Sequence, residues 1–186
     1  MAPASNFRIY LTHCLAGACL LLAACNPAFN WREVRPDNTA LSLLLPCKPD
    51  KATRNVPLGG QQTELAMLGC DTGGATFALA VATVPDTSQL AALLAGWRAA
   101  TLVNMKATGT GQATPLKVPG ASVLPPPALV RAEGRRADGS GVQSQAAYFA
   151  HGGQIFQAVI YADKISPEVS ETFFSSFKLD SGSARP

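Results

Sequence analysis

The most constraining feature of the sequence is its amino terminus, because it decides which residues take part in folding. Residues 1–13 contain Arg8 and no acidic residue, and residues 14–25 form the apolar run CLAGACLLLAAC. This run is shorter than the ~20 apolar residues of a membrane-spanning helix, but it fits the ~7 to 15 of a signal-peptide core. We predict that residues 1–24 are an export signal and that only the remainder folds.

The end of this segment resembles the lipobox of bacterial lipoproteins. Leu22-Ala23-Ala24-Cys25 combines a leucine, two small residues that fit the peptidase, and the cysteine that receives diacylglycerol. The resemblance implies cleavage between Ala24 and Cys25, acylation of Cys25 with chains such as palmitate, and stable anchoring in a membrane. Asn26 follows the cysteine where aspartate would favour inner-membrane retention, which implies the periplasmic face of the outer membrane. Cleavage without lipidation is the alternative.

Export also determines how the cysteines are interpreted. Three of the five leave with the signal or carry the lipid, so the mature chain keeps Cys47 and Cys70. Two thiols in an oxidising compartment predict one disulfide, which the chain-entropy model values at roughly 3 kcal/mol. The rival interpretation is a metal site. His151 is the single histidine of the mature chain and no carboxylate cluster completes such a site, so we expect no metal and no cofactor.

Composition favours one globular domain. The 186 residues are 47% hydrophobic and 15% charged, with a net charge of +3 that includes Arg8 of the signal. This leaves no basic surplus typical of nucleic-acid binding. Arg131, Arg135 and Arg136 form the nearest cluster and are predicted to lie at a polar hairpin tip, with contact to an anion or lipid headgroup as the alternative. We divide the chain into a signal (1–24), a lipidated terminus and tether (25–35), a single domain (36–180) and a flexible tail (181–186).

Two helices stand out in the pattern. Asp86 and Gln89 form a capping-box-like start to a long helix. Its apolar stripe predicts a face packed on a sheet, and consists of Leu90, Leu93, Leu94, Trp97, Thr101 and Met105. Ser166-Pro167-Glu168 begins a second helix, with a cap, a proline at the first position and an acid in the first turn. Its buried face is predicted to contain Val169, Phe173, Phe174 and Phe177.

The remaining apolar segments predict strands separated by turn residues. They span residues 40–45, 51–58, 63–69, 75–84, 109–118, 128–135, 142–149 and 154–161. Trp31 and Val34 are candidate core contacts preceding them. The resulting fold class is α+β, a mainly antiparallel single sheet packed against one long helix and a carboxyl-terminal helix.

This order of elements resembles the PsbP-like fold of small secreted and lumenal domains. The residues that carry the resemblance are Phe29-Asn30-Trp31, Leu45-Pro46, the helix after Val84-Pro85, and the ending from Gly153-Gln154-Ile155-Phe156-Gln157 to Phe173 through Leu179. The Cys47 and Cys70 pair is also similar to that of uncharacterised lipoproteins of Gram-negative bacteria. The PsbP-like family consists mainly of binding and assembly accessories, so the resemblance implies a non-catalytic function.

Catalytic candidates are few. Asp71-Thr72-Gly73 is similar to the aspartic-peptidase motif, but one copy would need a second chain to supply the other carboxylate. A polar hairpin turn is the competing interpretation. His151 could act as a base, or it could be an exposed turn residue beside Gly152-Gly153.

Three hypotheses follow from the sequence. The first is a lipid-anchored periplasmic protein that binds or helps assemble an envelope component, with the membrane and an envelope protein as partners. The second is a binder of a small apolar ligand or lipid between the long helix and the sheet, with Leu94, Trp97 and Phe156 as the candidate face. The third is a hydrolase that uses Asp71 or His151.

Overall fold

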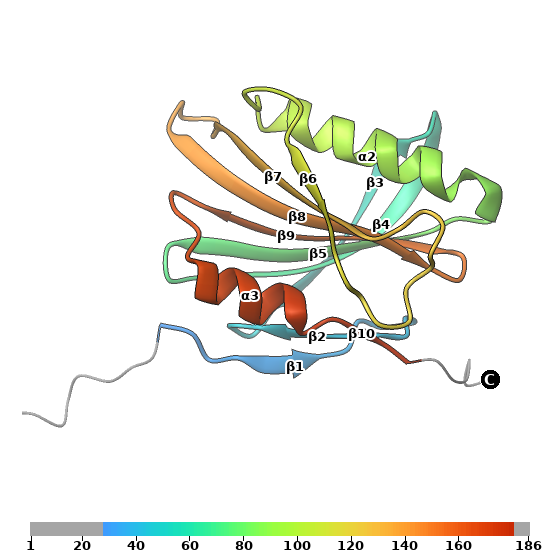
Figure 1. Cartoon of the computed structure of the whole chain (residues 1–186), viewed down its shortest axis with the longest axis horizontal. Helices are drawn as coiled ribbons and strands as arrows, with labels where there is room; N and C mark the ends of the chain where they lie inside the picture. The colour runs from blue at the N-terminus through green and yellow to red at the C-terminus, as the bar shows by residue number, and fades with distance from the viewer. Residues whose placement is uncertain (1–27, 181–186) are drawn as a thin grey trace, which may run out of the picture.

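The computed structural model describes residues 28–180, which form an α+β domain in three layers (Figure 1). The central layer is a seven-stranded sheet in the order β3-β4-β5-β9-β8-β7-β6, in which all neighbours are antiparallel. Its strands are β3 (Asp50–Leu58), β4 (Gln61–Thr72), β5 (Ala75–Thr83), β6 (Gln112–Pro115), β7 (Ala128–Arg135), β8 (Gly141–His151) and β9 (Gln154–Ala162). The predicted α+β class is confirmed.

One face of this sheet is covered by α2 (Leu90–Asn104), which follows a short 3₁₀ turn, η2 (Thr87–Gln89). The Asp86 carboxylate accepts hydrogen bonds from the Ser88 backbone and the Gln89 side chain, so the predicted cap starts the 3₁₀ turn. Leu90, Leu94 and Trp97 of the predicted stripe are buried against the sheet. The spacing of the stripe therefore placed this helix correctly.

The opposite face carries a second, three-stranded sheet and α3 (Pro167–Ser175) (Figure 1). The small sheet has the order β1-β2-β10, from β1 (Arg32–Val34), β2 (Leu41–Leu45) and β10 (Lys178–Leu179). The sequence predicts a single sheet, whereas the described residues form two. The apolar run that forms β2 predicts a buried strand but not its partners, and β1 and β10 are too short to show a periodic pattern.

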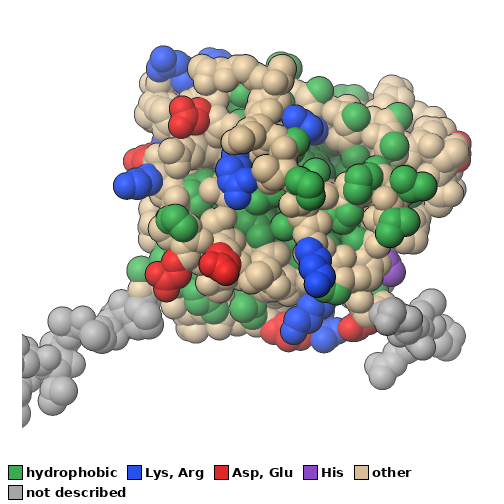
Figure 2. All heavy atoms as spheres, viewed as in Figure 1, with side chains coloured by type: hydrophobic (Ala, Val, Ile, Leu, Met, Phe, Trp, Pro, Cys, Tyr) green, Lys and Arg blue, Asp and Glu red, His purple; other side chains and the backbone are tan. Residues whose placement is uncertain are grey.

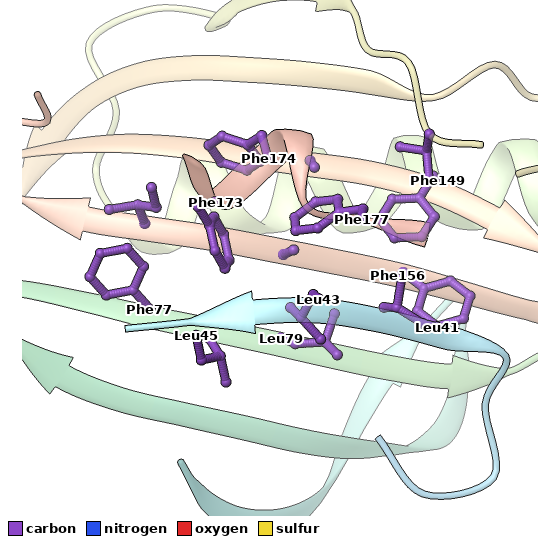
Figure 3. Packing of buried hydrophobic residues seen from close by; sticks show 14 of the residues in the cluster. Leu41, Leu43, Leu45, Phe77, Leu79, Phe149, Phe156, Phe173, Phe174 and Phe177 are labelled. Carbon is purple, nitrogen blue, oxygen red and sulfur yellow. The ribbon is translucent and has the colours of Figure 1, made fainter. Parts of the chain in front are cut away.

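Aromatic side chains fill the core between the small sheet, α3 and the large sheet (Figure 3). Phe149 and Phe156 stack with ring centroids 4.9 Å apart, and Phe77 meets Phe173 edge-on at 5.5 Å. Ser166 caps α3 by accepting a hydrogen bond from the Val169 backbone at 3.2 Å. Of the predicted buried face of α3, Phe173 and Phe174 are almost completely enclosed and Val169 is half-buried. Phe177 is buried as predicted, but it follows the helix rather than lying in it.

The fold begins inside the segment predicted as a tether. Phe29, Trp31 and Val34 pack against the aromatic core, as expected for the latter two. The Thr72 hydroxyl donates a 2.6 Å hydrogen bond to the Ala28 carbonyl. The predicted signal peptide, the predicted cleavage site Ala24-Cys25 and the predicted tail 181–186 lie outside the described residues. Within residues 28–180, no helix is long and apolar enough to cross a membrane.

The disulfide links the two sheets. Cys47 and Cys70 are bonded, with their Cα atoms 6.0 Å apart. Cys47 follows β2, as predicted, but Cys70 lies inside β4 rather than beyond the end of a strand. The strand continues because Gly73 and Gly74, both at positive φ, close a tight turn that lets Thr72 pair with Ala75.

Candidate functional site

A groove of about 720 Å³ lies between α2 and the large sheet. Its wall toward the sheet edge comes from β3 and β4, including Val56 and Leu65. Its roof comes from α2, including Trp97, and its floor includes Gln157 and Tyr161 of β9. Volumes of roughly 300 to 1,000 Å³ are typical of ligand pockets. This groove is the candidate functional site.

A glycine in β7 sets how closely the end of α2 approaches the sheet, and a second glycine accommodates a side chain of the helix. A Cβ atom at Gly59, in the β3–β4 turn, would collide with Leu93, and one at Gly134, in β7, would collide with the Met105 carbonyl. The Arg135 backbone donates a 2.8 Å hydrogen bond to that carbonyl. The end of α2 is therefore seated closely on β7, and the groove lies between the helix and the sheet.

The floor of the groove holds a fixed polar group. Gln157 is 9% exposed, and its side-chain amide donates hydrogen bonds of 2.8 Å to the Thr101 hydroxyl and to the Tyr148 hydroxyl. Thr101 in turn donates to the Trp97 carbonyl at 3.0 Å. These bonds join β8, β9 and α2 beneath the helix, so the Gln157 side chain is held in one orientation.

Two tyrosines near the groove remain neutral at physiological pH. Burial raises the pKa of Tyr161 to about 12, and the neighbouring Tyr148 adds to this shift. Burial also raises the pKa of Tyr148. Because a neutral phenol both donates and accepts hydrogen bonds, Tyr161 can contact a polar atom of a ligand without adding negative charge.

The only charged residues lining the groove, within the described chain, are Arg135 and Arg136. Arg135 donates to the Gly139 carbonyl at 3.1 Å. Arg136 donates to the Gly141 carbonyl at 2.6 Å and forms a 2.7 Å ion pair with Asp163, whose side chain is 85% exposed. Arg135 and Arg136 are at the predicted hairpin tip and give this end of the groove a positive charge, whereas Arg131, predicted to lie with them, is within β7 and opposite Gln145.

The structure separates the three residues of the predicted ligand face. Trp97 lines the groove, and Leu94 is buried in the same cluster without lining it. Phe156 points to the other face of the sheet and stacks on Phe149. Alternation along β9 explains this, because Phe156 faces α3 whereas Gln157 and Tyr161 face α2. The same alternation was the signal in the sequence that could have identified Gln157 and Tyr161.

The two catalytic candidates lie far apart. In the register of the sheet, Asp71 lies opposite Thr76, and Thr76 lies opposite Tyr161 of β9. His151 lies opposite Gln154, at the other end of β9. These two register positions are seven residues apart along β9, which is roughly 23 Å. Asp71 accepts a hydrogen bond from Thr76, and the Nδ1 of His151 lies 2.8 Å from the Gly120 carbonyl. The fold does not bring the two side chains together. Within residues 28–180, no cluster of three potential metal ligands occurs.

A second surface feature is the long loop that joins β6 to β7. Val123 and Leu124 in this loop are 81% and 82% exposed. Figure 2 shows basic and acidic side chains interspersed over the viewed face, with hydrophobic side chains gathered toward one side of it. The strand predicted over residues 109–118 is shorter in the structure, where β6 spans only Gln112–Pro115 and the loop follows it.

Comparisons with known proteins identify no family. No family model and no curated protein match the sequence. Among solved structures, a protein of unknown function from Pseudomonas aeruginosa is similar, with 15% identity, a TM-score of 0.34, and coverage of 75% of this chain and 85% of the other. A superposition of this quality establishes neither a shared fold nor a shared activity, so the groove is interpreted from its own residues.

Proposed function

We propose that this chain is an outer-membrane lipoprotein, anchored through Cys25 with its domain in the periplasm, and that it acts as a non-catalytic binding protein of the cell envelope. The lipobox-like Leu22-Ala23-Ala24-Cys25 supports the anchor. The disulfide between Cys47 and Cys70 is what an oxidising compartment favours.

The observation that carries the binding function is the groove between α2 and the sheet. It combines an apolar wall and roof with a few fixed polar groups, which is the composition of a typical small-molecule site. The bound molecule is apolar over most of its surface, because most residues that line the groove are apolar. These are Val56, Pro57, Leu58, Leu65, Trp97, Ala100, Met105 and Val142.

An assembly function is the second candidate, and the exposed Val123 and Leu124 favour it. Large apolar side chains that are exposed next to one another often mark a protein contact. In-cell crosslinking through a photoreactive residue at position 123 tests this function. Enrichment of one envelope protein, lost in a Val123→Ser, Leu124→Ser variant, is the supporting outcome, and no enriched protein would refute it.

The anchor is tested on the full-length chain in a Gram-negative host. We expect radiolabelled palmitate to be incorporated, the amino-terminal peptide to begin at an acylated Cys25, and the protein to fractionate with the outer membrane. Cys25→Ser removes all three results. Cys19→Ser, which alters a cysteine within the signal, is the matched control and keeps them. An unmodified amino-terminal peptide from the wild-type protein would overturn the anchor.

The binding function is tested by native mass spectrometry of the full-length protein purified from membranes. We expect a bound small molecule that is released on denaturation. Ala100→Trp should displace it, because Ala100 is an exposed residue of α2 that lines the groove. Ala99→Trp adds the same side chain next to it, at an exposed position outside the groove. Equal retention of the molecule by both variants would place its site elsewhere.

A further inference from the structure

Ala28, where the described chain begins, and the positive end of the groove lie at the same end of the large sheet. Thr72, which holds the Ala28 carbonyl, pairs with Ala75 at the β4–β5 turn. Ala75 pairs in turn with Ala162, one residue from Tyr161 of the groove floor. The β7–β8 turn with Arg135 and Arg136 is at this end too, and Figure 1 shows the start of the described chain on the same side.

The length of chain between the anchor and the fold is short. Cys25 is three residues before Ala28, and three residues span at most about 10 Å. Ala28 is held by Thr72, and Phe29 packs against the core next to it. If Cys25 is acylated, this end of the sheet lies close to the lipid surface.

From these two observations we propose that the groove takes one acyl chain of an anionic lipid from the membrane that holds the protein, with the headgroup at Arg135 and Arg136. This inference rests on the proposed anchor and identifies the ligand class of the proposed groove. The protein then acts as a lipid-binding protein, and its tether keeps the groove close to the membrane that supplies the lipid.

The charges of the groove select this ligand class. Within the described chain, two guanidinium groups and no carboxylate line it, and guanidinium groups bind phosphate and carboxylate through paired, charge-assisted hydrogen bonds. The ion pair of Arg136 with Asp163 is exposed to solvent, so a headgroup can replace it at little cost. The apolar wall beyond the arginines suits an acyl chain.

The test uses the two tryptophans of the chain, Trp31 and Trp97. Bromine atoms on lipid chains quench a tryptophan only at close range. A Trp31→Phe variant leaves Trp97 as the single reporter, inside the groove. The full-length acylated protein is reconstituted into vesicles of brominated phosphatidylglycerol mixed with phosphatidylcholine, or of brominated phosphatidylcholine alone.

We expect Trp97 to be quenched by brominated phosphatidylglycerol and much less by brominated phosphatidylcholine. Ala100→Trp would add a reporter, so the blocking variant in this assay is Ala100→Phe, with Ala99→Phe as its control. Blocking should abolish the quenching and the control should not. Equal quenching by the two lipids would overturn the charge selection, and no quenching would overturn acyl-chain binding.

The arginines are tested in the same assay. Arg135→Gln with Arg136→Gln should raise the phosphatidylglycerol content needed for half-maximal quenching by roughly tenfold or more, since charge-assisted contacts are lost. Arg131→Gln, on β7 but outside the groove, should leave it unchanged. An equal effect of both changes would show a general surface charge effect and refute a headgroup site at the groove.

Failure of this inference is distinguishable from failure of the anchor. Flotation of the vesicles reports whether the protein is membrane-bound, and the Trp97→Phe variant reports whether Trp31 approaches the lipid. Protein that floats without quenching of Trp97 retains the anchor and refutes lipid binding in the groove. Quenching of Trp97 by free brominated fatty acid, but not by vesicle lipid, would refute the membrane as the source.

Discussion

The Arg135 backbone donates a hydrogen bond to the Met105 carbonyl across 2.8 Å, which ties the end of α2 to the strand that carries the groove arginines. This contact is possible because residue 134 is glycine. A Cβ atom there would overlap the Met105 carbonyl, which is backbone and cannot rotate away. The position of one glycine therefore controls how closely the helix approaches the sheet.

Gly134→Ala should lower the free energy of unfolding by about 1 to 3 kcal/mol, the usual cost of overpacking a closely fitted interior. Gly141→Ala is the matched control, because a Cβ atom at Gly141 meets nothing within 4 Å. Urea unfolding followed by circular dichroism measures both. Equal stability of the two variants would contradict the close seating of α2.

Removal of the disulfide should destabilise the domain. Cys47 and Cys70 are separated by 23 residues, and for a loop of this size the chain-entropy model gives a loss of roughly 3 kcal/mol. The double variant Cys47→Ser, Cys70→Ser should unfold at a lower urea concentration, and a reductant should shift the wild-type protein in the same direction.

The double variant is also the control for the reductant, which should leave its unfolding curve unchanged. Equal thiol labelling of native and reduced wild-type protein at Cys47 and Cys70 would contradict the bond itself.

Tyr161 should make the stability of the domain depend on pH in the alkaline range. Its pKa is raised from 10.0 to about 12 in the folded state. Between these values the folded protein retains a proton that the unfolded chain releases, so this contribution is complete below pH 10 and is lost as the pH rises toward 12. Tyr161→Phe should flatten the decline of unfolding free energy over this window.

Absorbance of the phenolate checks the assignment directly. The native protein should show tyrosine ionisation later than a urea-unfolded sample, and the difference should shrink in Tyr161→Phe. An identical titration of native and unfolded wild-type protein would contradict the buried state of this ring.

The cap of α3 should contribute measurably to stability. Ser166→Ala removes the acceptor for the Val169 backbone N–H and should lower the free energy of unfolding by about 1 kcal/mol. Ser166→Asp retains a capping oxygen and places a negative charge at the start of the helix, so it should keep most of the stability. Thermal unfolding of the three proteins side by side makes the comparison, and equal loss in both variants would refute a capping function.

Much of the fold could be predicted because it depends on local chemistry. The stripe of α2, the cap at Ser166 and the alternation of the long strands each appear within a short window of sequence, and the structure has them at the predicted places. Cys47 and Cys70 could be paired because export and lipidation would account for the other cysteines, and the bond is present.

What the sequence could not determine depends on contacts between distant segments. The second sheet forms because β2 pairs with β1 on one side and with β10, more than a hundred residues later, on the other. The groove likewise combines α2 with strands from both halves of the chain. The distance of α2 from the sheet depends on Gly134, and only the Met105 carbonyl above that position explains why it is a glycine. Local patterning therefore specified the elements of this protein, whereas long-range packing decided which of them enclose its candidate site.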